Sequence, residues 1–163
     1  MSKAGQPRFR IVAEHDAGRR AAICRELLGR LPDWFAIPES VAKYIDEVRS
    51  RAMAVAFDGD DTILGFVTLE RVTPVAAEVH LIAVLPSLHR RGVGRALLAW
   101  TEAAAREQGA AMLLVKTLAP SVVYEPYDAT RAFYRACGFV PLAVFPDMWD
   151  PENPCLLMGK SLD

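Results

Sequence analysis

Two glycines and three arginines gather at the point where an apolar segment changes into a helical pattern. The stretch reads "HRRGVGR" from 89 to 95. Glycine lets the backbone take unusual dihedral angles and approach a ligand closely, and a helix N-terminus offers unpaired N–H groups with a partial positive charge. Together with the arginines these groups would form a cradle for a phosphate or diphosphate. The alternative is an ordinary strand-to-helix turn with arginines on the surface.

Two common nucleotide-binding loops do not fit this stretch. The loop that binds nucleoside triphosphates needs G-x-x-x-x-G-K-[ST], and the sequence contains no such pattern. The dinucleotide fingerprint G-x-G-x-x-G follows the first strand of its domain. Here its third glycine position is Leu97, and the stretch lies in the middle of the chain. The phosphate compound is therefore expected to belong to another class.

The segments around this turn predict a mixture of strands and helices. Helical apolar spacing alternates with the short apolar runs typical of strands. Asp128 or Thr130 is expected to cap the last helix, and residues 146–154, "PDMWDPENP", are expected to form a long acidic loop. The order predicts a mixed α/β fold in which an antiparallel meander leads into a β-α-β crossover. We expect strands over 8–14, 52–58, 62–72, 76–86, 110–118, 140–145 and 155–162, and helices over 16–31, 37–50, 94–109 and 128–139.

Length and composition predict one globular domain. The chain has 163 residues, 52% of them hydrophobic, so it can bury a core and is not expected to be disordered. Its formal net charge of -1 gives no sign of a nucleic-acid or membrane partner. No run approaches the roughly 20 apolar residues of a membrane span. The opening "MSKAGQPRFR" lacks the apolar core of a secretory signal, so we expect a cytoplasmic protein.

Three cysteines, Cys24, Cys137 and Cys155, are spaced neither as a disulfide framework nor as a zinc site. We expect buried, reduced thiols and no bound metal.

The segment "IAVLPSLHRRGVGRALL" resembles the coenzyme A loop of the GCN5-related N-acetyltransferases, the GNAT family. The family pattern is [QR]-x-x-G-x-[GA], after a strand that ends in an apolar-Val-x-Pro step, and residues 89–94 here read "HRRGVG". A second segment, "TRAFYRACGF" at 130–139, resembles the family helix that carries "FY" and ends in "GF". The resemblance covers about residues 52–145. Two motifs in the right order are far more specific than either alone.

The resemblance implies a fold and a cofactor. The fold would be a single GNAT-like acyltransferase domain over residues 1–163, with a central twisted mixed sheet splayed between two strands and about four flanking helices. Acetyl-CoA would be the co-substrate, its diphosphate on the turn and its pantetheine arm along the preceding strand as an added half-strand. The cofactor-binding residues implied are Ile82, Ala83, Val84, His89, Arg90, Arg91, Gly92, Val93, Gly94, Arg95 and Tyr134.

Two departures from the family stand out. His89 replaces the usual Gln or Arg, which should be tolerated because backbone N–H groups do most of the binding. The asparagine often found before the tyrosine helix is absent, and Tyr127 and Asp128 occupy that region.

The implied activity is transfer of an acetyl group from acetyl-CoA to a primary amine by direct attack. The amine must be neutral, because an ammonium group with a pKa of about 10 has no lone pair at neutral pH. The oxyanion must be stabilised and the thiolate must leave. Tyr134 stands where the family places a tyrosine that hydrogen-bonds to the sulfur; the alternative is a plain core aromatic. The alternative function is a non-catalytic acyl-CoA sensor or interaction module.

Two residues are candidates for the catalytic base. Glu78 and His80 lie two positions apart on the central strand and face the same side. Glu78 could instead be a solvated strand end, and His80 a hydrogen-bonded core histidine. Relatives that act on protein N-termini carry a glutamate on the following strand, whereas this chain has Lys116 there.

Two segments, "LPDWFAIPES" and "FPDMWDPENP", are expected to wall the acceptor site. Their acidic and aromatic residues suit a cationic amine, and a solvated acidic loop is the alternative. The expected acceptor is a small-molecule amine or a peptide N-terminus, with no nucleic acid, no membrane, and a homodimer left open. The expected substrate-binding residues are Trp34, Phe35, Tyr124, Tyr127 and Trp149.

Overall fold

The computed structural model describes residues 8–163, so the first residues of the expected non-secretory N-terminus lie outside the described range. The chain divides into two compact units. The first unit comprises the chain up to Leu69 together with Leu81–Ala103, and the second comprises Glu70–His80 together with Ala104–Asp163. Strands β3 (Ile63–Thr73) and β4 (Ala76–Val84) and helix α3 (Val93–Glu107) each pass from one unit into the other.

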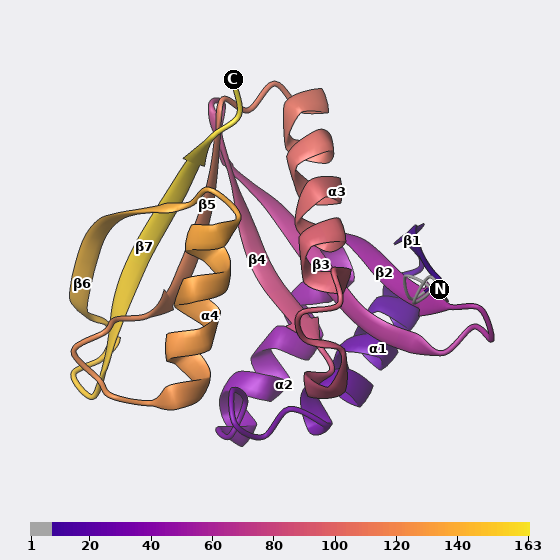
Figure 1. Cartoon of the computed structure of the whole chain (residues 1–163), viewed down its shortest axis with the longest axis horizontal. Helices are drawn as coiled ribbons and strands as arrows, with labels where there is room; N and C mark the ends of the chain where they lie inside the picture. The colour runs from indigo at the N-terminus through magenta and orange to yellow at the C-terminus, as the bar shows by residue number, and fades with distance from the viewer. Residues whose placement is uncertain (1–7) are drawn as a thin grey trace, which may run out of the picture. The chain divides into compact units, whose positions relative to one another are not determined.

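The first unit begins with a strand and two helices (Figure 1). These are β1 (Phe9–Glu14), α1 (Ala17–Gly29) and α2 (Pro38–Glu47), followed by a single 3₁₀ turn and by β2 (Ala52–Asp58). The side chain of Asp16 accepts a hydrogen bond from the N–H of Arg19 at 2.7 Å and so caps α1. Strands β1, β2 and β3 pair antiparallel in chain order.

The core of the first unit forms between α1 and the strands. Leu27 and Leu28 of α1 are fully buried and belong to the same cluster as Met53, Val55 and Phe66 of β2 and β3. Helix α2 has no fully buried residue, and its apolar side packs only partly against this cluster. The apolar side of α2 that faces this cluster is therefore only partly covered.

The second unit contains the crossover and a long hairpin. Its elements are β5 (Met112–Leu118), α4 (Glu125–Ala136), β6 (Val140–Asp150) and β7 (Asn153–Ser161). The pairs between β4 and β5 are parallel and run from Ala76↔Met112 to Val79↔Val115, whereas β7 pairs antiparallel with β5 and β6. The sheet has seven strands in the order β1-β2-β3-β4-β5-β7-β6. A mixed α/β fold with a meander and a crossover is therefore confirmed.

The expected loop over residues 146–154 is wrong. Strand β6 continues to Asp150, and β7 starts again at Asn153 after a two-residue turn. The Asp150 carboxylate accepts the N–H groups of Glu152 and Asn153, both at 2.9 Å, and so closes the turn. Strand β6 is the last in the sheet, where prolines are tolerated because one side of the strand has no ladder to break.

The expected start of the last helix is also wrong. Helix α4 begins at Glu125 with Pro126 in its first turn, so neither Asp128 nor Thr130 is its cap. The Asp128 carboxylate instead pairs with Arg131, and the Thr130 hydroxyl donates to the carbonyl of Pro126 at 3.0 Å.

The expectation that the three cysteines are buried is confirmed. Cys24, Cys137 and Cys155 are buried and free. Burial raises the pKa of the Cys24 thiol to about 12, so this thiol stays protonated at neutral pH. Among the described residues, no helix is long and apolar enough to cross a membrane.

A close backbone contact inside the first unit gives a stability prediction. A Cβ added at Gly65 on β3 would lie 2.7 Å from the carbonyl oxygen of Ala83 and 3.1 Å from a methyl carbon of Val84. We expect Gly65→Ala to lower the free energy of unfolding by about 1–3 kcal/mol, measured by urea unfolding, because backbone atoms must move. Gly29→Ala is the matched control, since an added Cβ there meets nothing within 4 Å. Equal urea midpoints for the two variants would contradict this reading.

Candidate functional site

The turn between β4 and α3 has two residues with positive φ. Arg90 has φ 65° and Gly92 has φ 86°, whereas Gly94 lies in the first turn of α3. Of the two glycines, only Gly92 adopts the left-handed backbone conformation that glycine favours. The other left-handed residue of the turn is Arg90. Left-handed arginine costs conformational energy, so the surrounding turn must hold it.

The arginines of this turn are available to an anion. Arg90, Arg91 and Arg95 are exposed, and none of them has an ion-pair or hydrogen-bond partner through its side chain within residues 8–163. Val93, the first residue of α3, is fully buried and fixes the start of the helix. The N–H groups of the first helical turn have no intrahelical acceptors. This arrangement can bind a phosphate group through backbone N–H groups and guanidinium groups.

Along the end of β4, the backbone N–H and C=O groups of successive residues point to opposite edges of the strand. The N–H of Leu85 donates to the carbonyl of Leu64 on β3 at 3.1 Å. Because the directions alternate along a strand, the polar groups of Val84 and Ile82 point to the other edge. At that edge the Nε2 atom of His89 lies 2.9 Å from the Val84 carbonyl oxygen. The other backbone groups of this edge are suited to an extended ligand.

The residues around the α1–α2 connection include two of the expected aromatics. The Trp34 ring meets the His89 ring edge-on, with centroids 5.7 Å apart and planes at 72°. Phe35 meets Tyr44 of α2 in the same manner at 6.0 Å and 87°. In the first unit the structure therefore brings together the predicted residues Trp34, Val84 and His89.

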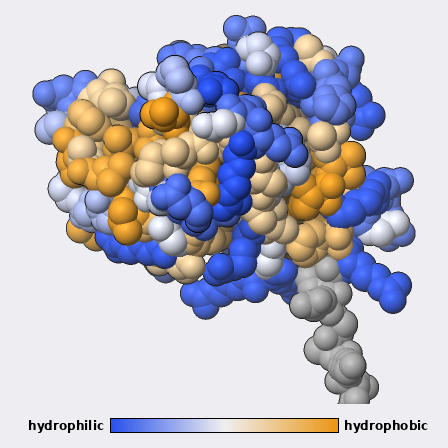
Figure 2. All heavy atoms as spheres, turned by 90° about the horizontal axis from the view of Figure 1, so that it is seen from above, coloured by the Kyte–Doolittle hydropathy of each residue, from blue (hydrophilic) through white to orange (hydrophobic). Residues whose placement is uncertain are grey.

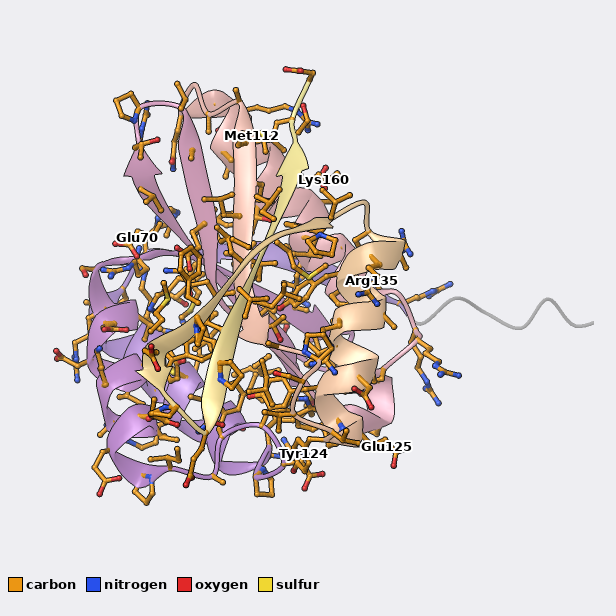
Figure 3. The ribbon with its side chains drawn as sticks, turned by 90° about the vertical axis from the view of Figure 1, so that its left-hand side faces the viewer. Glu70, Met112, Tyr124, Glu125, Arg135 and Lys160 are labelled. Atoms are coloured by element: carbon orange, nitrogen blue, oxygen red, sulfur yellow. The ribbon has the colours of Figure 1, made fainter. Side chains whose placement is uncertain are left out.

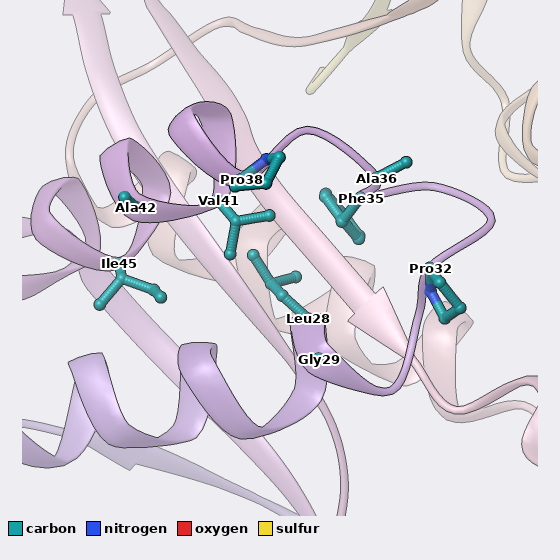
Figure 4. A pocket seen from close by; sticks show the side chains of 9 residues that line it. All are labelled: Leu28, Gly29, Pro32, Phe35, Ala36, Pro38, Val41, Ala42 and Ile45. Atoms are coloured by element: carbon teal, nitrogen blue, oxygen red, sulfur yellow. The ribbon is translucent and has the colours of Figure 1, made fainter.

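A pocket lies between α1 and α2 (Figure 4). Part of its lining comes from the segment "LPDWFAIPES", which was expected to wall the acceptor site, but only Phe35 of the lining was named as a binding residue. The pocket is a hollow of about 330 Å³ and no polar side chain lines it. The amphipathic sequence of α2 could have predicted this pocket, because α1 does not cover all of the apolar side of α2. The lining residues are Leu28, Gly29, Pro32, Phe35, Ala36, Pro38, Val41, Ala42 and Ile45.

In the second unit, Tyr134 lies in α4 and is 4% exposed. Its ring packs between Phe133 and Phe139, with centroids 5.5 and 5.7 Å away. Its hydroxyl forms no hydrogen bond with any residue in 8–163. Burial raises the pKa of Tyr134 well above its usual value, and the Tyr127 and Cys137 groups raise it further. Tyr134 is therefore a protonated donor at neutral pH with an uncommitted O–H.

The position of α4 is fixed at its middle and at its C-terminal end. Buried Arg131 donates to the Leu118 carbonyl at the end of β5, which ties the helix to the strand. The N–H of Phe139 donates to the Tyr134 carbonyl at 3.0 Å, and Gly138 has φ 94°, as expected for a helix stop. Figure 3 shows Tyr124 and Glu125 at the start of this helix and Arg135 near its end.

The candidate base Glu78 forms an ion pair with Lys116. Glu78 lies opposite Leu114 in the parallel ladder, so Lys116 comes two residues further along the same face of β5. Its Nζ atom lies 3.4 Å from Glu78 Oε2, and the Glu78 side chain is only 14% exposed. Cys155 on the neighbouring strand is close enough that both charges act on it, although burial is the main reason that the pKa of its thiol is raised. His80 is half-buried on the same strand.

The remaining predicted residues are aromatics of the second unit. Tyr124 precedes α4, and Tyr127 lies in its first turn, with ring centroids 6.0 Å apart. Trp149 is 47% exposed on β6 rather than in a loop. Among residues 8–163 no group of three or more His, Cys, Asp or Glu side chains could hold a metal ion.

Comparison with known proteins identifies relatives of this arrangement. The family model described as the acetyltransferase (GNAT) domain matches residues 49–141, which include the turn, the Glu78–Lys116 pair and Tyr134. No curated protein matches the chain.

Solved structures share the whole fold. A protein from Desulfovibrio desulfuricans assigned to the GNAT family has a TM-score of 0.80 at 21% identity, covering 96% of this chain and 100% of that chain. A GNAT acetyltransferase from Elizabethkingia anophelis with acetyl-CoA bound has a TM-score of 0.71 at 18% identity, with 94% and 97% covered. An aminoglycoside 6'-N-acetyltransferase complexed with coenzyme A has a TM-score of 0.68 at 19% identity, with 93% and 97% covered. The expected fold class is therefore confirmed.

Proposed function

The chain belongs to the acetyltransferase (GNAT) family, and we propose that it transfers an acetyl group from acetyl-CoA to a primary amine as one acyltransferase domain over residues 1–163. The observation that carries the proposal is the turn from Arg90 to Gly92, where positive φ angles and arginines without a side-chain partner in residues 8–163 stand at the start of α3. Two proteins of similar fold contain coenzyme A or acetyl-CoA, which supports the same co-substrate here. The free, buried thiols fit a reducing cytoplasm.

In this proposal the first unit supplies the acetyl-CoA site. The N–H groups and guanidinium groups of residues 90–95 hold the diphosphate, whose negative charge the helix start favours. The open edge of residues 82–84 holds the amide groups of the pantetheine arm as an added strand would be held. Val93 contributes through its backbone, because its side chain is buried.

The chemical step moves one acyl group and one proton. The lone pair of the neutral amine attacks the thioester carbonyl carbon, and the resulting oxyanion is stabilised by a backbone N–H. The C–S bond then breaks and the electron pair leaves on sulfur. We assign Tyr134 the role of donating its O–H to this sulfur, since its hydroxyl has no other hydrogen-bond partner in residues 8–163 and burial keeps it protonated.

The amine also has to lose a proton. We assign this proton to the Glu78 carboxylate, directly or through water, with His80 as the other candidate. The Lys116 ammonium group stabilises the ionised carboxylate, which is the form that can accept a proton. Lys116 therefore takes part in this proposal as the partner of the base.

The acceptor is proposed to be a small-molecule amine or a peptide N-terminus. Trp34, Phe35, Tyr124, Tyr127 and Trp149 offer aromatic faces, which attract ammonium groups. The pocket beside Phe35 would hold an apolar part of such a molecule. The Asp150 carboxylate would contribute less to binding a cationic acceptor than its charge suggests, because it already accepts two hydrogen bonds in the β6–β7 turn.

The outer hairpin supports a homodimer. Figure 2 shows apolar residues among polar ones on one face of the molecule. Six large apolar residues of the edge strand β6 are exposed, and such a strand pairs readily with another chain. These residues are Val140, Leu142, Val144, Phe145, Met148 and Trp149.

Calorimetric titration with acetyl-CoA tests the proposed cofactor site. Gly92→Val should weaken binding by at least about tenfold, because a side chain would strain the turn and crowd the space for the diphosphate. The matched control is Gly109→Val, which changes another glycine with positive φ and open space around it, but at the other end of α3. Equal loss of affinity in both folded variants would contradict the site.

The pH dependence of acetyl transfer tests the proposed base. In Glu78→Gln the acid limb of kcat/KM should move toward the acceptor's own pKa, and high pH should restore the rate, since only spontaneously neutral amine can then react. Lys116→Met is the comparison variant: it removes the ion-pair partner but keeps the carboxylate, so the rate changes while the acid limb stays well below the acceptor's own pKa. The assignment of Glu78 fails if Lys116→Met moves the limb as far as Glu78→Gln does, or if the full change appears in His80→Gln instead.

A further inference from the structure

We propose that His89 is a positioning residue that couples acetyl-CoA binding to the α1–α2 connection through its contact with Trp34. The inference rests on the proposed function, because it takes the β4 edge and the following turn as the acetyl-CoA site. It adds a route by which the occupancy of this site reaches the aromatic residues proposed for the acceptor. All the residues involved belong to the first unit.

The first half of the coupling is the hydrogen bond between His89 and Val84. A carbonyl oxygen only accepts, so the His89 Nε2 atom carries the hydrogen and donates it across 2.9 Å. Val84 is the last residue of β4, and its polar groups point to the edge that does not pair with β3. The imidazole therefore occupies the last carbonyl group on this free edge of β4. A pantetheine arm laid along residues 82–84 would lie next to this hydrogen bond.

The second half is the ring contact between His89 and Trp34. The two rings meet edge-on at 5.7 Å, a preferred geometry for aromatic pairs. Trp34 also packs against the core cluster of the first unit, as do Phe35 and Leu88. Phe35 in turn meets Tyr44 and lines the pocket between α1 and α2. His89 is exposed, and its ring contact with Trp34 connects it to this packed group of side chains.

These two contacts have separable chemical requirements. The hydrogen bond needs an N–H donor at the imidazole position, whereas the ring contact needs a flat aromatic group. Glutamine meets the first requirement and phenylalanine meets the second, so each substitution removes one half of the coupling. If acetyl-CoA binding changes the position of Trp34, then an acceptor that fixes Trp34 must change the affinity for acetyl-CoA by the same factor, because such coupling is reciprocal.

The test uses Trp34 as the only tryptophan. The sequence has three tryptophans, so Trp100→Phe and Trp149→Phe together leave Trp34 as the reporter. Acetyl-CoA is titrated into this reporter protein by calorimetry and by tryptophan fluorescence. The inference expects the emission of Trp34 to change along the same binding curve that calorimetry measures.

The variants decide whether His89 carries this signal. In His89→Gln the amide still donates to the Val84 carbonyl but the ring contact is lost, so the Trp34 response should be lost. In His89→Phe the ring contact stays but the hydrogen bond to Val84 is lost, and the response should also be lost. A full Trp34 response in either folded variant would overturn the coupling, as would a silent Trp34 in a reporter that binds acetyl-CoA by calorimetry. Absence of any calorimetric binding would instead remove the proposed function and the inference with it.

Discussion

The structure depends on how the chain leaves β4 and enters α3. Two consecutive features, left-handed Arg90 and left-handed Gly92, turn the backbone so that α3 starts at the buried Val93 while the arginines remain in solvent. An anchored helix start with unpaired N–H groups is a rigid source of positive potential. The same turn places His89 back against the end of β4. The proposed cofactor site, the strand edge and the loop proposed for the acceptor thus all depend on a few backbone angles.

In the proposed reaction the two units contribute different chemistry. The first would offer backbone groups and positive charge, which bind and orient but do not move protons. The second holds the groups suited to proton transfer, Tyr134 and the Glu78–Lys116 pair, each supported by its own packing. Tyr134 is held by neighbouring rings and by the anchoring of α4 through Arg131, so its hydroxyl is left without a structural task. A hydroxyl with no partner among the described residues is available to a ligand as a donor.

The turn, α1 and α4 could be predicted from the sequence, because each depends on a pattern of residues that are neighbours in the chain. The glycines and arginines indicated the turn, the apolar spacing indicated α1, and "FY" with a following glycine indicated α4. Features that depend on distant segments could not be predicted. The Glu78–Lys116 pair requires the register of two parallel strands, and the Trp34–His89 contact requires the packing of a loop on a turn. The extension of β6 was missed because its prolines suggest a loop, whereas an edge strand accepts them.

Release of free thiol from acetyl-CoA in the presence of a panel of primary amines tests the central claim most directly. The panel covers polyamines, aminoglycosides, amino acids and peptides with free N-termini, and the wild-type chain is compared with Tyr134→Phe. The account predicts thiol release that depends on at least one amine, and a rate roughly 10²–10⁴-fold lower in Tyr134→Phe at nearly unchanged acetyl-CoA affinity. Tight binding of acetyl-CoA without thiol release for any amine would contradict it and would favour a non-catalytic acyl-CoA-binding module.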